Sequence, residues 1–224
     1  MKRKMIIYIV ATLTLFSMSA CSLFGKKEEP ANGMLLLGDE QSVSPLVERY
    51  KKETTSKELY KVKLDTKDEK KILIINETVA KKFIQKGILQ KRDNDEGMIS
   101  SEPITSLPKF TKDKAILFAN KEDKNMKDVM INNEKISVQY DSDTWLGGIR
   151  SYEFEGCIIV LKDAQYDKIP VPQINMELLS FNKSLGDMRS HNPDDKINKE
   201  YVTIKKLMKG TSIIGYELVT ITTK

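Results

Sequence analysis

Three short apolar runs, each ended by polar residues typical of turns, mark the first half of the chain. They cover residues 34–37, 72–75 and 115–118, roughly forty residues apart. An apolar run of this length that stops at turn residues is typical of a buried strand. The pattern therefore predicts three buried strands, with the connecting segments packed on them.

The segment after the second run predicts a helix. Asn76 is a favourable N-cap, and Glu77 lies where the first helical turn attracts negative charge. Apolar residues then recur three and four positions apart, which places them on one face: Val79, Ala80, Phe83, Ile84 and Ile88. Gly87 is expected to end this helix.

Weaker helical patterns follow the other two runs. Ser44 can cap a helix in which Pro45 takes the first position, where the missing N–H costs little. After the third run, Met126, Val129 and Met130 predict only a short helix. The first half of the chain therefore alternates strands with helices of unequal strength.

The second half is richer in β-branched and aromatic residues. Strands are predicted over residues 135–140, 155–161, 201–208 and 212–222. Residues 173–180 fit a short helix or a strand, and residues 183–198 fit an exposed polar loop. We expect an α+β body over residues 34–224, built on a single mixed or antiparallel sheet with a few helices. Two small sub-domains that meet near residues 120–135 are the alternative.

The first twenty residues have the pattern of a secretory signal. Lys2, Arg3 and Lys4 form a positive start, and residues 5–16 form an uncharged, largely apolar run. That run is shorter than the roughly 20 apolar residues that a permanent membrane-spanning helix needs. Residues 1–20 are therefore predicted to be a signal peptide that is removed.

The signal ends in Met18, Ser19, Ala20 and Cys21. This ending resembles the lipobox of bacterial lipoproteins, although Met18 stands where leucine is usual. The whole chain resembles an uncharacterised lipoprotein of Firmicute (Bacillus-type) bacteria. The resemblance implies cleavage before Cys21, lipidation of its thiol, and acyl chains in the outer face of the cell membrane. The alternative is an ordinary cleaved signal in which Cys21 has no special role.

Residues 21–33 are predicted to be a flexible tether behind the lipidated cysteine. Few of them are apolar after Phe24, so the segment can bury little surface. Cys157 is the other of the two cysteines in the chain. If Cys21 carries lipid, the body contains no intramolecular disulfide.

Charge excludes one class of partner. The chain has a formal charge of +5, and the predicted signal holds three of those positive charges and no acidic residue. The mature chain would then carry +2, without the basic stripe that nucleic-acid binding needs. A charged fraction of 31% with interleaved lysines and acids fits a solvated protein surface.

Catalytic side chains are sparse. His191 is the single histidine, and it lies in a polar stretch that fits a surface loop better than a general base. Cys157 precedes an apolar strand, which favours a structural thiol over a nucleophile at a helix start. With so few such residues, the sequence predicts no zinc site and no cofactor.

Two acidic clusters and a pair of glutamates are candidates for cation or catalytic sites. Residues 93–97 and 141–146 contain Asp, Asn and Gly, but neither has the spacing of a calcium loop, so both are predicted to be turns. Glu153 and Glu155 would share a strand face, and a carboxylate pair could serve glycoside hydrolysis. Nothing else in the sequence indicates a sugar cleft, so solvent-facing glutamates are the simpler interpretation.

Trp145 is the one candidate ligand-binding residue. It lies beside Gly147 and Gly148, and a tryptophan in a glycine-flanked loop can form a platform for a partner or a sugar. It can equally fill the core. The sequence therefore favours a lipid-anchored, non-enzymatic protein that binds a small ligand or an envelope protein, with an envelope hydrolase that uses acidic residues as the alternative.

Overall fold

A computed structural model of the chain describes residues 28–93, 101–148, 150 and 155–222. Its strands are β1 (Gly33–Leu37), β2 (Thr54–Lys67), β3 (Lys70–Asn76), β4 (Leu89–Arg92), β5 (Ser101–Pro103), β6 (Ala115–Phe118), β7 (Asp128–Ile131), β8 (Glu134–Ser142), β9 (Thr144–Leu146), β10 (Cys157–Leu161), β11 (Gln173–Phe181) and β12 (Gly215–Val219). Its helices are α2 (Glu40–Arg49), α3 (Glu77–Gln85), α4 (Asp163–Tyr166) and α5 (Lys196–Met208), with one turn of 3-10 helix, η1 (Lys121–Asn125).

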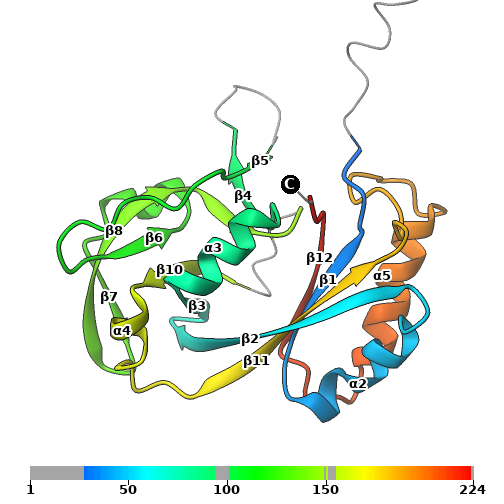
Figure 1. Ribbon diagram of the computed structural model, residues 1–224, viewed down its shortest axis with the longest axis horizontal. Helices are drawn as coiled ribbons and strands as arrows, with labels where there is room; N and C mark the ends of the chain where they lie inside the picture. The colour runs from blue at the N-terminus through cyan, green and yellow to red at the C-terminus, as the bar shows by residue number, and fades with distance from the viewer. Residues whose placement is uncertain (1–27, 94–100, 149, 151–154, 223–224) are drawn as a thin grey trace, which may run out of the picture.

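Most strands form one mixed sheet, in the order β12-β1-β11-β2-β3-β10-β6-β8-β7. The β3–β10 and β6–β8 pairs are parallel, and the remaining pairs are antiparallel. Figure 1 shows β2 and β11 crossing the middle of the molecule, with α2 and α5 at one end and β7 and β8 at the other. The predicted α+β class with a mixed sheet is confirmed. A small antiparallel sheet, β5-β4-β9, was not predicted.

Successive residues of the central strands enter different cores. Leu35 and Leu37 pack on one face of the sheet with Leu73 and Ile75, under the apolar side of α3. The intervening residues point to the opposite face, where two separate clusters form. One cluster lies under α2 and α5 and includes Leu36, and the other includes Ile74. Alternation along a strand produces this division, since neighbouring side chains leave a sheet on opposite faces.

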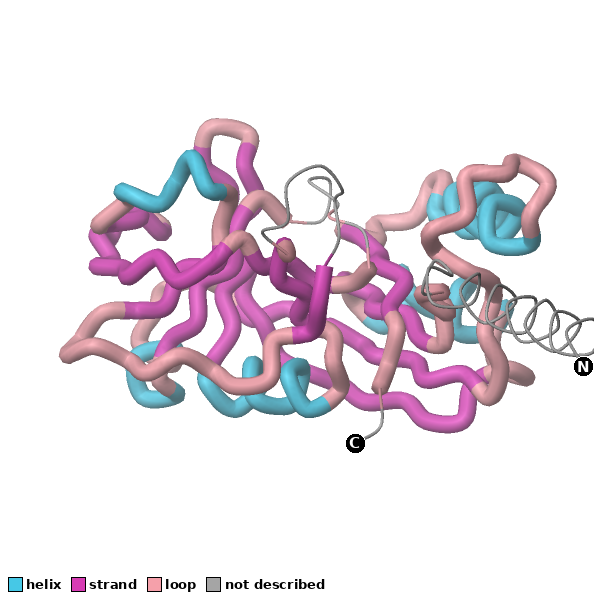
Figure 2. The backbone as a smooth tube through the Cα atoms, turned by 90° about the horizontal axis from the view of Figure 1, so that it is seen from above, coloured by secondary structure: helices cyan, strands magenta, loops and turns pink. Residues whose placement is uncertain are grey.

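The sheet thus has two differently covered ends. The helical half consists of β12, β1 and β11 with α2 and α5. The curled half consists of β2, β3, β10, β6, β8 and β7, in which β7 bends back until it contacts β2. Figure 2 shows the strands running through an elongated molecule with helices on both sides. The predicted internal boundary at residues 120–135 falls within the curled half and stays a prediction.

The predicted caps of α3 are confirmed. Asn76 accepts a hydrogen bond from the backbone N–H of Val79 at 2.8 Å, and Gly87, with a φ of +69°, follows the last turn. The start of α2 was predicted wrongly. Asp39 caps that helix by accepting from the backbone N–H of Ser42 at 2.8 Å, so Pro45 lies inside the helix rather than at its first position.

Three further predictions of local structure were wrong. Residues 201–208, predicted as a strand, form the second part of α5, and the polar loop predicted for residues 183–198 also contains the start of that helix. Leu185 and Met188 in this loop are buried. The short helix predicted with Met126, Val129 and Met130 is absent: η1 ends at Asn125, and Val129 and Met130 belong to β7.

The folded body begins before β1. The backbone N–H of Glu29 donates to Asp187 at 2.9 Å, and its carboxylate pairs with Arg189. Ala31 is completely buried. The predicted tether, which stays a proposal, would therefore end before Glu29. Within the described ranges no helix is long and apolar enough to cross a membrane.

Candidate functional site

Trp145 lies in the middle of β9, on the small sheet. Only 2% of its surface is exposed, and the guanidinium carbons of Arg92 and Arg150 each lie 5.8 Å from its ring centroid. Within the described part of the chain, its indole N–H has no hydrogen-bond acceptor. The ring is therefore enclosed rather than presented as an open platform. A role in binding stays a prediction.

Asp143 joins those two arginines. Arg92 Nε donates to one carboxylate oxygen at 2.6 Å, and Arg150 Nη1 donates to the other. The side chains of Asp143 and Arg150 are 5% and 7% exposed. Arg150 also donates to the carbonyl of Gly156 at 3.3 Å, which connects β9 to the start of β10. Because a buried charge without its partner is costly, these three side chains stabilise one another as a unit.

A pocket of about 580 Å³ opens beside this unit. Its lining residues are Arg92, Asn120, Lys121, Glu122 and Asp143. The middle three come from the start of η1, so the pocket lies between that turn and the small sheet. The lining is polar and carries both signs of charge. It suits a small polar ligand with its own donors and acceptors rather than an apolar one.

Two buried carboxylic acids lie beside the residues that follow β9. One of them, Glu155, was predicted to face solvent, and that prediction was wrong because the side chain is buried. Glu155 accepts a hydrogen bond from the backbone N–H of Leu146 at 2.6 Å. Glu217, on β12, lies directly against Gly147, where an added Cβ atom would approach its Oε1 to 2.8 Å. The two acids thus hold the end of β9 between the curled half and the helical half.

Burial changes the acidity of both groups. It raises the pKa of Glu155 to about 7, against the opposing effects of the Leu146 N–H and of Arg150. It raises the pKa of Glu217 well above its ordinary value, and the charge of Glu155 raises it further. At neutral pH the pair therefore carries less than its full negative charge. Neither acid lines the pocket beside Asp143.

The raised pKa of Glu155 predicts a specific pH dependence of stability. An acid whose pKa is raised in the folded state stabilises most below its ordinary pKa of 4.5, and this contribution is lost as pH rises toward about 7. The loss amounts to about 3 kcal/mol, at 1.36 kcal/mol per pKa unit. We expect Glu155→Gln to reduce the fall in the free energy of unfolding between pH 5 and pH 7.5, measured by urea titration.

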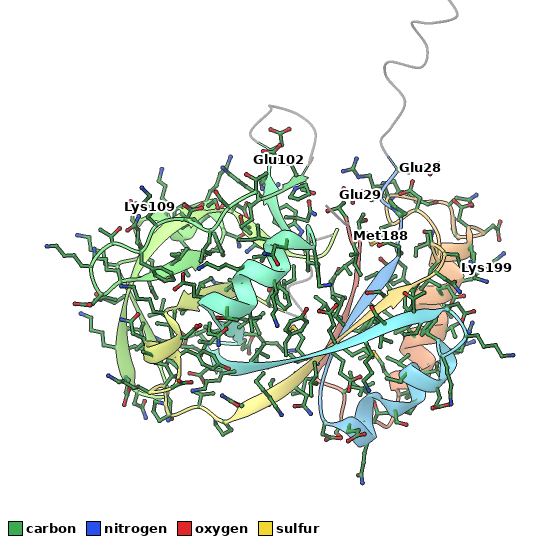
Figure 3. All side chains as sticks on the ribbon, viewed as in Figure 1. Glu28, Glu29, Glu102, Lys109, Met188 and Lys199 are labelled. Atoms are coloured by element: carbon green, nitrogen blue, oxygen red, sulfur yellow. The ribbon has the colours of Figure 1, made fainter. Side chains whose placement is uncertain are left out.

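The matched control is Glu102→Gln, on an exposed side chain of β5 that Figure 3 shows at the outer end of the small sheet. This control should keep the pH dependence of the wild type. Equal slopes for Glu155→Gln and the wild type would show that Glu155 is not the titrating group.

The other residues that the sequence singled out lie apart from this site. His191 is exposed in its loop, as predicted. Cys157 is half-buried at the start of β10, and burial raises the pKa of its thiol to about 12, which suits a structural role. Residues 141–146 form the bent passage from β8 to β9 rather than a simple turn. Cys21 and Glu153 lie outside the described residues, and among those described no cluster of potential metal ligands occurs.

Comparison with known proteins decides the family. Residues 31–211 match a family described as an uncharacterised lipoprotein family. The chain belongs to this lipoprotein family. A crystal structure described as that of a lipoprotein from Bacillus anthracis is similar, with 30% sequence identity and a TM-score of 0.63. The similarity covers 85% of this chain and 99% of that chain. No curated protein matches the chain.

Membership of the lipoprotein family confirms the resemblance drawn from the N-terminal residues. The two observations are independent, because the family match begins at residue 31, beyond the signal pattern and Cys21. The family is consistent with a membrane-associated, extracytoplasmic protein. The lipid itself and the cleavage before Cys21 remain proposals.

Most residues of the candidate site in this lipoprotein could not be identified from the sequence. Arg92, Arg150 and Glu217 lie far apart in the sequence and form no motif. One signal was available: Gly147 and Gly148 directly follow Trp145, and paired glycines often mark a close approach of backbone to another group. That approach is to Glu217, Glu29 and Met188 rather than to a ligand.

Proposed function

We propose that this lipoprotein is anchored to the outer face of the cell membrane by acyl chains on Cys21, and that its body binds a ligand or an envelope protein without catalysing a reaction. The observation that carries the anchor is the order of positive start, apolar run, small residues and cysteine, combined with the family match. Two or more chains give stable attachment, because each buried methylene contributes about 0.8 kcal/mol.

The ion pair between Glu29 and Arg189 marks the point where the proposed tether would join the body. It lies where the chain enters the body, and Figure 3 shows Glu28, Glu29 and Met188 close together there. Residues 22–28 could span at most about 25 Å. The end of the body that carries Glu29 would therefore lie near the membrane, and the contact of Gly148 with Glu29 places the end of β9 beside it.

Metabolic labelling with a fatty acid tests the anchor. Wild-type protein should take up the label, and Cys21→Ala should not, because the thiol that carries the lipid is gone. Cys157→Ala is the matched control and should stay labelled. Protease added to protoplasts should digest the body of the labelled protein, because the body lies outside the membrane. Label retained by Cys21→Ala, or lost from Cys157→Ala, would overturn the assignment.

Two observations favour binding over hydrolysis for the body. Arg92 and Asp143, which line the pocket, are paired with each other, and the buried acids do not line the pocket. The alternative, an envelope hydrolase, is supported by the raised pKa of Glu155 beside a second acid. Incubation with cell-wall glycan distinguishes the binding protein from the hydrolase. If the protein only binds, the emission of Trp145, the single tryptophan, would change and no reducing ends would be released. If the protein is a hydrolase, the wild type would release reducing ends from the glycan, and the Glu155→Gln variant would release none.

A further inference from the structure

The interior of the curled half is apolar and nearly enclosed. Its buried residues include Ile74, Leu117 and Ile159, together with Ile131 from the strand that bends back. Asn132, in the turn between β7 and β8, fastens this bend. Its backbone N–H donates to the Asp65 carboxylate of β2, and its side-chain amide donates to the Pro170 carbonyl, each at 2.8 Å. The curl therefore surrounds its core in the manner of a small barrel.

One end of this interior is closed. Tyr166 of α4 is buried there, and its hydroxyl donates to the Lys61 carbonyl at 3.1 Å. Lys63 donates to the carbonyls of Tyr166 and Ile169, each at 2.7 Å, and so satisfies the backbone around the end of α4. Because α4 follows the last residue of β10, this closure lies at the carboxyl end of that strand.

The opposite end, where β10 begins, holds a pocket of about 330 Å³. Apolar side chains from several elements line it: Ile72, Leu117, Ala119, Met126, Val129, Met130 and Cys157. Met126 is 37% exposed, one of the few large apolar side chains exposed on the described surface. The mouths of barrels are frequent ligand sites, and methionine adapts readily to different apolar surfaces.

Charges at the rim of the pocket are paired. Lys70 lies 4.0 Å from Asp123, and Asp128 pairs with Lys135 at 3.0 Å. The remaining charged lining residues, Lys67 and Asp68, are sequence neighbours of opposite sign. The rim therefore offers no net charge for a ligand to neutralise, so the occupant that fits is uncharged.

Volume limits the size of the occupant. An apolar cavity of about 150 Å³ accepts one benzene ring, so this pocket of about 330 Å³ encloses two fused rings or a short acyl segment, and a third ring would extend through its open mouth. We propose that the open end of the curled half binds a small, uncharged, apolar molecule beside Cys157. This site is separate from the polar pocket at Asp143, and its test is independent of the proposed anchor.

Cys157 supplies an internal reporter, whose slow alkylation is followed at alkaline pH because burial raises the pKa of its thiol. We would use the mature polypeptide, residues 21–224, with Cys21→Ser, so that Cys157 is the single thiol. Phenylnaphthylamine, an uncharged apolar fluorophore, should become fluorescent on binding. At ten times its Kd it should slow alkylation of Cys157 about tenfold, since about a tenth of the sites is then empty. Anilinonaphthalene sulfonate has the same rings with a negative charge and should protect less.

A substitution at the mouth of this pocket tests whether the probe binds there. Met126→Lys should raise the Kd for phenylnaphthylamine about fivefold, because it removes apolar contact area. Val202→Lys, on an exposed apolar residue of α5, is the matched control and should leave the Kd unchanged. An unchanged rate of Cys157 alkylation with probe present would overturn the proposal, and that measurement does not depend on any Met126 variant. Equal Kd values for the two lysine variants would also overturn it.

Discussion

Replacing Asp143 with asparagine is expected to lower the free energy of unfolding by about 3 to 5 kcal/mol. Asp143 is the shared partner of Arg92 and Arg150, and both Asp143 and Arg150 are almost fully enclosed. Asparagine keeps the volume but removes the negative charge, which leaves the buried guanidinium of Arg150 without compensation. Chemical denaturation of Asp143→Asn at neutral pH measures the loss.

The control for this prediction is two residues away. Asp141 is exposed, and Asp141→Asn should change the free energy of unfolding by about 0.5 kcal/mol or less. Trp145 provides a second readout, because both arginines lie against its ring. Its fluorescence should shift in Asp143→Asn and not in Asp141→Asn. Similar stability of the two variants would contradict the account of the buried unit.

Replacing Gly147 with alanine is expected to be similarly harmful, with a loss of about 2 to 4 kcal/mol. Gly147 has a φ of +80°, in the left-handed region that disfavours a Cβ atom. The added atom would also meet the backbone carbonyl of Leu218 at 2.9 Å and the Glu217 carboxyl. Since a carbonyl of β12 cannot move without disturbing the sheet, the clash would separate the end of β9 from β12.

Gly210→Ala separates the two causes of this loss. Gly210 has nearly the same φ, +85°, but nothing lies within 4 Å of its added Cβ atom. It should therefore show only the backbone cost, about 1 kcal/mol. The difference between the thermal melting points of the two variants measures the close approach to Glu217 and Leu218. If Gly147→Ala were no worse than Gly210→Ala, the tight contact between β9 and β12 would be absent.

Local sequence patterns predicted correctly the elements that bury one regularly spaced apolar face. The helix α3 has one apolar face, a capping asparagine and a terminal glycine, so its position follows from the sequence. β2 was missed, although Tyr60, Val62 and Leu64 alternate with lysines as expected of a strand with one polar face. The signal was present but was obscured by the high charge of the segment.

The error at α5 has a different origin. Its β-branched and aromatic residues favour a strand by composition, yet Ile197, Tyr201 and Ile204 recur at helical spacing and pack toward the same core. Tertiary packing of that face outweighs the local propensity. The periodicity could be recognised only by starting before residue 201, in the stretch assigned to a loop.

The candidate site could not be predicted for a third reason. Asp143 and Trp145 are close in sequence, but Arg92, which contacts both, comes from β4, and Glu217, which lies against Gly147, comes from β12. Their meeting depends on the pairing of β4 with β9 and on the approach of β9 to β12, and neither leaves a motif. Trp145 is singled out by the sequence as a candidate, but its contact with Arg92 depends on that distant pairing.

The central claim is that Cys21 carries the membrane anchor, and one measurement tests it most directly. Mass spectrometry of the protein extracted from membranes with detergent should find an N-terminal peptide that begins at Cys21 and carries the mass of a diacylglycerol group on its thiol. A peptide that begins at Met1, or a free Cys21 thiol in the mature chain, would contradict the account.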